Sequence, residues 1–195
     1  MIVNRKKRFC IYTPFKNYSS SIIDFFNQWN CYTRFLGSNP HYSWEPTLWT
    51  NPHSATVPEL VMQEGWKRYL PIRNPYDRVI SQWKWHIQME NDAISFDEWL
   101  MLHSKQAVQM PVSIVYPQYT HLIKCENIIE EFLNNEDIYH GDGPERFDIL
   151  NNFPHTNKSL IKKSIALTQR QQDIIYYYHY MDFVVGDYSK NYNPS

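Results

Sequence analysis

The stretch from Tyr69 to Trp83 constrains the fold most, because it reads as a strand that runs directly into a helix. Residues 69–72 are apolar and suit a short buried strand. Asn74 followed by Pro75 is typical of a helix start, since Asn caps the first turn and Pro fits the first helical position. Asp77 supplies the acid expected in that turn. A strand that feeds a helix in this way favours an α/β protein.

The same stretch has the features of an anion-binding site. A helix N-terminus presents backbone N–H groups, and Arg73 precedes it with a forked guanidinium. Asn74, Asp77 and Ser81 fall at i, i+3 and i+7 and share one face of the helix, so Arg73 and Ser81 can converge on one ligand. The alternative is that Arg73 and Arg78 are ordinary helix-flanking charges, paired with acids at the surface.

A second strand, loop and helix lie near the start of the chain. Residues 9–13 read as a buried strand, 14–21 as a polar turn and 22–29 as an amphipathic helix. The turn carries Lys16 and the hydroxyls of Ser19, Ser20 and Ser21. Helix-start N–H groups, one ammonium and several hydroxyls together make a phosphate cradle. It is not a Walker A loop, because GxxxxGK[ST] is absent. The alternative is a capped helix beside a lysine that binds nothing.

Length and charge bound the remaining possibilities. The chain has 195 residues, of which 43% are hydrophobic, so it can bury a proper core. We expect a single domain over residues 1–195, with a frayed basic leader at 1–8. The formal net charge of −1 gives no global attraction to nucleic acid or to an anionic membrane, so anion binding must be local. No apolar run is long enough for a membrane span and no signal peptide is evident, so we expect a cytoplasmic protein.

Cysteine and histidine spacing indicates neither a disulfide framework nor a metal site. Cys10, Cys31 and Cys125 are widely spaced, odd in number and form no CxxC pair. No HxxxH or HExxH pattern occurs. We expect reduced, buried thiols and no bound metal.

Three segments, taken in order, resemble one family. The sequence of residues 73–81, Arg-Asn-Pro-x-Asp-Arg-x-x-Ser, resembles the motif that binds the 3′-phosphate of the cofactor in sulfotransferases. These enzymes use 3′-phosphoadenosine 5′-phosphosulfate (PAPS), and the resemblance is closest to the carbohydrate (heparan/chondroitin-type) branch. Residues 14–21 are similar to the family's 5′-phosphosulfate loop, although Phe15 is inserted and Tyr18 stands where Gly or Ala is usual. Residues 153–159 resemble a late Pro-His-x-Asn-Lys-Ser segment, and 182–188 the closing Asp-Phe-x-x-x-x-Tyr.

The resemblance implies a fold and a set of cofactor contacts. The fold would be a three-layer α/β/α sandwich of the P-loop-NTPase-like sulfotransferase type, with a mainly parallel central sheet. Lys16 would stabilise the leaving phosphate of a loose, anionic transition state, and no metal would be required. Arg73 and Ser81 would bind the 3′-phosphate, and Lys158 would cover the nucleotide. The 5′-phosphosulfate would be held by Lys16, Asn17, Tyr18, Ser19, Ser20 and Ser21. The product would be 3′-phosphoadenosine 5′-phosphate (PAP).

The acceptor hydroxyl needs a general base, for which histidine is suited near neutral pH. His53 is preferred because the family keeps a histidine ahead of its central strand; His41 comes second and Glu59 third. The resemblance implies a carbohydrate acceptor. The aromatic-rich residues 31–52 and the tryptophans Trp83, Trp85 and Trp99 could stack on sugar rings, or the tryptophans could be core. The sequence does not indicate an oligomeric state.

Two other functions compete with the enzyme. One is a catalytically inactive nucleotide-binding or protein-interaction module on the same fold. The other is an unusual P-loop kinase, which the missing Walker A context and the absence of a Mg²⁺-binding signature argue against.

The remaining elements follow from periodicity and from turn signals. We expect a helix from Thr56 or Pro58, continuation of the central helix to Ile87 or Met89, and a polar loop over 135–146. Further helices are predicted at 96–103, 126–133 and 169–180, and strands at 32–36 and 120–125.

Overall fold

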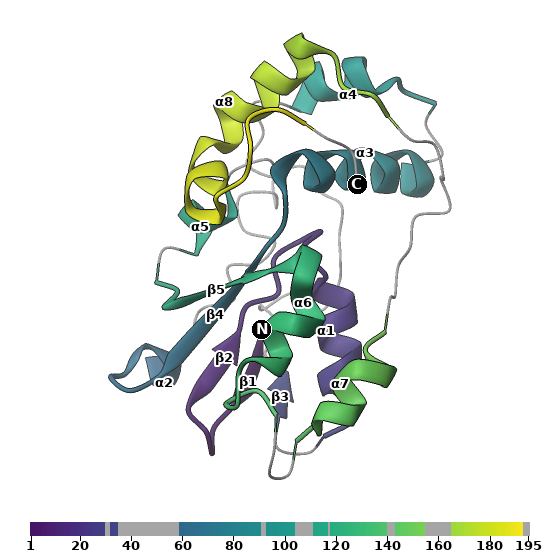
Figure 1. The fold of residues 1–195 in the computed structure, drawn as a ribbon. Coiled ribbons are helices and arrows are strands. Elements are labelled where there is room, and N and C mark those ends of the chain that lie inside the picture. The colour runs from purple at the N-terminus through teal and green to yellow at the C-terminus, as the bar shows by residue number, and fades with distance from the viewer. Residues whose placement is uncertain are drawn as a thin grey trace. The chain divides into compact units, whose positions relative to one another are not determined.

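The computed structural model describes residues 1–29, 32–34, 59–90, 93–103, 111–116, 118–139, 143–154 and 165–192 (Figure 1). Contacts between residues divide the chain into two compact units. The first, residues 1–72 with 116–157, holds the β-sheet and is called the sheet unit. The second, residues 73–115 with 158–195, is called the helical unit.

The sheet unit contains five strands in the order β3-β1-β2-β4-β5. Their bounds are β1 Ile2–Asn4, β2 Phe9–Ile11, β3 Tyr32–Arg34, β4 Lys67–Ile72 and β5 His121–Lys124. β2, β4 and β5 run parallel, whereas β1 is antiparallel to both β2 and β3. The protein is therefore α/β as predicted, but the sheet is mixed, with two parallel and two antiparallel pairings where a mainly parallel sheet was expected.

The basic leader is not frayed. Ile2–Asn4 forms β1, which is buried and pairs with β2 in the register Val3 to Cys10. The Asn4 carboxamide oxygen accepts from the Lys7 backbone N–H at 3.0 Å, and the Lys7 ammonium donates to the carbonyl of Tyr139. The basic run is thus the turn of a β-hairpin, and the two apolar residues ahead of it were sufficient for a strand.

Helices α1 (Ser19–Phe26), α6 (Ile128–Leu133) and α7 (Arg146–Asn152) lie together beside the sheet (Figure 1). α1 buries Ile22, Phe25 and Phe26, which share one face at i, i+3 and i+4. These side chains join a core that is rich in aromatic rings, and Tyr32 fixes its edge by donating to the Ile138 carbonyl at 2.7 Å. The core includes Phe9, Ile11, Tyr69, Ile123, Phe132, Ile149 and Phe153. The short elements α2 (Glu59–Met62) and the 3₁₀ turn Cys125–Asn127 complete the unit.

The helical unit is built from α3 (Pro75–Glu90), α4 (Phe96–His103), α5 (Val112–Val115) and α8 (Gln169–Gly186). Trp83 and Trp99 are 6% and 3% exposed and belong to its core, so for these two tryptophans the core alternative holds. The other core members include Tyr76, Val79, Phe96, Leu100, Ile175 and Phe183.

Local sequence signals explain where these helices begin and end. The Asn74 side chain accepts from the backbone N–H of Tyr76 at 3.0 Å, which confirms the predicted cap of α3. α8 runs six residues beyond its predicted end, from a Thr168 capping box to Asp187, which adopts the left-handed conformation. The helix is kinked at His179, where the backbone leaves helical geometry.

The predicted polar loop is non-helical up to Glu145 wherever it is described, but the helix α7 that follows it was not predicted. Its signal is a reciprocal cap, in which the Glu145 backbone N–H donates to Asp148 at 3.0 Å. Phe147 and Leu150 remain exposed and only Ile149 is buried, so the apolar periodicity was weak. Within the described ranges, no helix is both long and apolar enough to cross a membrane.

Candidate functional site

The loop that follows β2 holds the first group of predicted site residues. Directly after β2, the Tyr12 backbone N–H donates to the carbonyl of Tyr69 in β4 at 2.9 Å. The loop then continues to Ser19, where α1 begins. Lys16 and Tyr18 both have positive φ, 63° and 58°. Non-glycine residues pay about 1 kcal/mol or more for this conformation, which makes the loop an unusual one.

The Tyr18 side chain does not fill the loop. Its ring is half-buried and packs against the core of the sheet unit. Lys16 and Tyr18 have positive φ, and the Asn17 N–H between them is donated to the Pro14 carbonyl at 3.2 Å, so it is used within the turn. Because its ring packs against the core, the bulky residue that distinguishes this loop is compatible with an anion cradle.

The start of α1 adds further donors to this loop. The first backbone hydrogen bond of the helix runs from the Ile22 N–H to the Tyr18 carbonyl at 2.9 Å. The backbone N–H groups of the three serines therefore belong to the first turn, which has no i→i−4 acceptor within the helix. Ser21 is buried, whereas Ser19 and Ser20 are half-buried. There is no acidic residue in the first turn to repel an anion. Lys16 supplies the positive charge, and its Nζ lies 5.0 Å from the centre of the Phe15 ring.

Asn17 ties the loop to the neighbouring strand. Its side chain is fully buried, and its Nδ2 donates to the carbonyl oxygen of Pro71 in β4 at 2.9 Å. Its backbone N–H donates to Pro14 at 3.2 Å within the turn. Asn17 was predicted to contact the cofactor, but its side chain serves to anchor the loop at the carboxyl end of β4.

Arg73 and Ser81 belong to the helical unit, and both are half-buried. Arg73 directly precedes the Asn74 cap, and Ser81 lies two turns into α3. Asp77, on the same face, accepts from the Tyr192 hydroxyl at 2.9 Å. Arg73 and Ser81 thus lie before and within the same helix, and their convergence on one ligand stays a prediction.

Arg78 has a role that the sequence did not indicate. The suggestion that it is a helix-flanking surface charge is wrong, because its side chain is only 2% exposed. It forms an ion pair with Asp182 at 3.1 Å and a hydrogen bond to Nδ1 of His179 at 2.8 Å. Burial lowers its pKa, and the charge of Asp182 opposes that change. Of the two arginines in the motif, Arg78 is structural and Arg73 remains the candidate ligand.

Several predicted residues lie outside the described residues, namely His41, His53 and Lys158. Glu59 opens α2, but only its backbone is described. The identity of the general base therefore stays a prediction. Among the described residues, no group of three or more His, Cys, Asp or Glu side chains could hold a metal ion.

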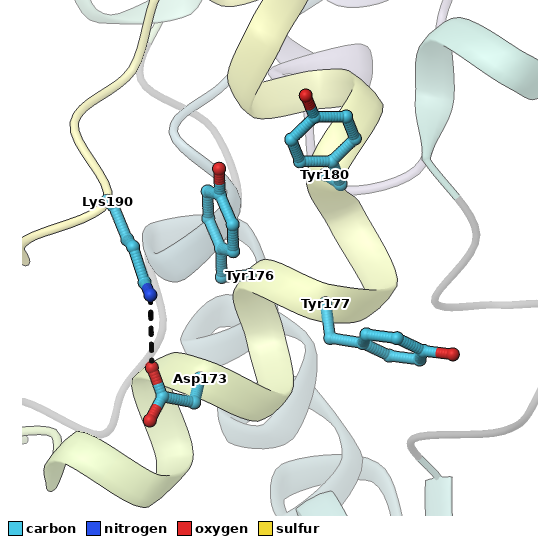
Figure 2. A pocket seen from close by; sticks show the side chains of 5 residues that line it. All are labelled: Asp173, Tyr176, Tyr177, Tyr180 and Lys190. Carbon is cyan, nitrogen blue, oxygen red and sulfur yellow. Dashed lines mark ion pairs between the residues drawn. The ribbon is translucent and has the colours of Figure 1, made fainter.

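A depression on α8, which Figure 2 shows from close by, was not predicted. It has a volume of about 580 Å³ and is lined by Asp173, Tyr176, Tyr177, Tyr180 and Lys190. Its one sequence signal is the segment Tyr-Tyr-Tyr-His-Tyr of residues 176–180, which does not indicate which of the rings are exposed.

Comparison of the chain with models of protein families, with curated proteins and with solved structures finds no match. The fold and the two groups of site residues define an α/β protein that carries a candidate anion-binding loop after β2 and a cationic helix start after β4.

Proposed function

We propose that the protein is a PAPS-dependent sulfotransferase, with a P-loop-like sulfotransferase fold, that transfers a sulfuryl group to a hydroxyl of a carbohydrate. One observation carries the proposal. The Lys16 loop follows the carboxyl end of β2, Arg73 follows the carboxyl end of β4, and these two strands are parallel neighbours. The bond from Asn17 to Pro71 holds the loop at the end of β4, two residues before Arg73 in the chain.

This topology suits a nucleotide with two phosphate groups on one ribose. Open α/β sheets bind ligands at the carboxyl ends of their strands. A cofactor with a 3′-phosphate and a 5′-phosphosulfate needs two anion sites, and here the two candidate sequences leave adjacent strands in the family's order. In the proposal, Lys16 and the Ser19–Ser21 turn hold the 5′ group, while Arg73 and Ser81 bind the 3′-phosphate.

The reaction then follows the general logic of group transfer from phosphate. The acceptor oxygen attacks sulfur, and the bond between sulfur and the bridging oxygen of the 5′-phosphate breaks. His53 takes the proton of the acceptor hydroxyl. Lys16 neutralises the charge that grows on the bridging oxygen, and PAP leaves. Because the transition state is loose, positioning and electrostatic stabilisation supply most of the catalysis.

Nucleotide binding tests the proposal. Thermal unfolding is followed with PAP, with adenosine 5′-monophosphate (AMP) and with ATP–Mg²⁺; a ligand at a hundred times its Kd adds about 2.7 kcal/mol to the free energy of unfolding. We expect stabilisation by PAP well above that by AMP. Arg73→Ala should remove this preference, because a charge-assisted contact is worth roughly 1.5–3 kcal/mol. Arg170→Ala, at an exposed arginine of α8, is the matched control and should bind PAP normally.

The outcomes separate the candidate functions. Selective stabilisation by PAP, followed by transfer of labelled sulfate from PAPS that is lost in Lys16→Ala, supports the enzyme. Selective PAP binding without transfer to any hydroxyl acceptor supports the inactive nucleotide-binding module. Preference for ATP–Mg²⁺ would favour a kinase, and indifference to all three nucleotides would rule out the proposed cofactor.

A further inference from the structure

One face of α8 carries aromatic side chains that the helical unit leaves in solvent. Asp173, Tyr176, Tyr177 and Tyr180 fall at i, i+3, i+4 and i+7 and so share a stripe of the helix. Tyr177 is 76% exposed and Tyr180 is 50% exposed. The opposite face, with Ile175, His179 and Asp182, is buried. Within the stripe, Tyr176 is half-buried and packs against the core of the helical unit, whereas Tyr177 and Tyr180 reach solvent.

The depression on this stripe is held in a defined shape. Tyr176 is anchored from below, since its ring lies 5.1 Å from that of Phe183 in the core. Its edge meets Tyr180 at 5.6 Å with the rings nearly perpendicular. Lys190, from the segment after α8, places its Nζ 5.1 Å from the centre of the Tyr176 ring. Figure 2 shows Tyr176 standing between Lys190 and Tyr180, and Tyr177 directed away from both.

The charges in the depression cancel. Lys190 Nζ lies 3.5 Å from Asp173 Oδ1, and both side chains are 54% exposed. A phosphorylated or sulfated ligand would meet the Asp173 carboxylate without a surplus of positive charge to offset it. The lining also offers polar groups, because Tyr176, Tyr177 and Tyr180 each carry a hydroxyl. The site thus combines exposed ring faces with donors and acceptors and has no net charge.

We propose that this stripe of α8 binds an uncharged oligosaccharide. A pyranose ring has apolar C–H faces and a rim of hydroxyl groups, which matches exposed tyrosine rings flanked by a carboxylate and an ammonium. Tyr177 and Tyr180 stack on the sugar rings, and Asp173 and Lys190 hydrogen-bond the hydroxyls. None of the lining residues belongs to the proposed cofactor-binding set, so the inference does not rest on the sulfotransferase proposal.

Oligosaccharide binding by the full chain, without nucleotide, tests this site. Cellohexaose and chitohexaose are the probes, and isothermal titration together with saturation-transfer NMR is the measurement. We expect weak binding in which Tyr177→Ala and Tyr180→Ala each raise Kd about fivefold, as the loss of an aromatic contact predicts. Tyr177→Phe keeps the ring and should stay within about twofold of wild type. Phe147→Ala removes an equally exposed ring on α7 and should bind normally.

Two results would overturn the inference. One is that neither oligosaccharide binds the wild-type protein. The other is binding that survives in the Tyr177→Ala, Tyr180→Ala double variant. Circular dichroism of each variant distinguishes a lost contact from a lost fold, and recovery in Tyr177→Phe makes the same distinction through binding itself. PAP binding is measured in parallel, so that failure here and failure of the sulfotransferase proposal are told apart.

Discussion

Arg78 Nη2 lies 3.1 Å from Asp182 Oδ2, and both side chains are at most 2% exposed. The Asp182 carboxylate also accepts from the Val112 N–H at 2.8 Å, the Ser113 N–H at 2.9 Å and the Ser113 hydroxyl at 2.7 Å. Arg78 in turn donates to His179. One buried carboxylate on α8 therefore joins that helix to α3 and α5. α3 is the helix of the Arg73–Ser81 segment, and α8 carries the tyrosine stripe.

Breaking the Arg78–Asp182 pair should be strongly destabilising. Asp182→Asn leaves the Arg78 guanidinium buried without a counter-charge, and loss of one partner in a buried pair costs about 3–5 kcal/mol. The measurement is urea unfolding at neutral pH. Asp173→Asn is the matched control, because it breaks an exposed pair worth 1 kcal/mol or less. Equal costs for the two variants would show that the buried pair does not hold the helical unit together.

His179 should make stability depend on pH. Burial, together with the neighbouring Arg78 charge, lowers its pKa well below 6.5. Above about pH 6.5 the imidazole is neutral in the folded and the unfolded state, so it contributes no pH dependence. Below that value the unfolded chain binds a proton that the folded chain does not. The free energy of unfolding should then fall by up to about 1.4 kcal/mol per pH unit, until the folded-state pKa is reached.

The measurement for His179 is urea unfolding between pH 7.5 and pH 5. His179→Asn offers a carboxamide oxygen in place of Nδ1 and cannot titrate, so its stability should fall less steeply than that of wild type. Parallel curves for wild type and His179→Asn would contradict the assignment.

Asn17→Ala should loosen the loop after β2. The change removes the bond to Pro71 and leaves a buried carbonyl oxygen without its donor, which costs about 1–3 kcal/mol. If the cofactor proposal holds, PAP binding should weaken as well, because Lys16 and the serines lose their anchor. Chemical unfolding and PAP titration are measured together. Asn27→Ala, at the exposed end of α1, should leave both unchanged.

Features fixed by neighbouring residues could be predicted from the sequence. The strand before Asn74 and the helix that begins at Pro75 depend on local caps and periodicity, and both were predicted correctly. The predicted bounds of α4 were also correct. The bond between Arg78 and His179 joins residues 101 apart in the chain, and no local pattern indicates it. Arg78 therefore looked like any charge near a helix start, although it is among the most buried side chains.

The candidate site, too, has features that depend on neighbouring residues and features that depend on contacts between residues far apart in the chain. The positions of Lys16 and of the serines follow from spacing along a loop. The role of Asn17 does not, because its partner Pro71 is 54 residues away. The tyrosines of α8 were visible as a run, but tyrosine is common in cores and at surfaces alike. Which tyrosines reach solvent is decided by the packing of the buried face of α8, with Ile175 and His179, against the rest of the helical unit.

Cys10 should be unreactive in the folded protein. Its thiol lies in the sheet, and burial raises its pKa to about 12, although Arg68 acts in the opposite direction. Almost no thiolate exists at pH 8, and the thiolate is the reactive form. Mass spectrometry after iodoacetamide treatment should find Cys10 and the buried Cys125 unmodified in native protein and modified in urea. Rapid native labelling of Cys10 would show that the sheet opens.

Gly186→Ala should destabilise the protein through Tyr188. A Cβ at residue 186 would lie 2.3 Å from Cε2 and 2.6 Å from Cδ2 of the Tyr188 ring. That ring packs against the core of the helical unit, so it cannot move without losing contacts. Overpacking of this kind costs about 1–3 kcal/mol. Urea unfolding of the variant gives the value.

The sign of the Gly186→Ala effect should depend on the Tyr188 ring. In a helix without the clash, replacing Gly by Ala stabilises by up to about 1 kcal/mol, because Ala loses less backbone entropy on folding. In a Tyr188→Ala background the same substitution should therefore raise the free energy of unfolding. A double-mutant cycle isolates the coupling between the two positions. A substitution that is equally harmful in both backgrounds would mean that Gly186 is required for another reason than its contact with Tyr188.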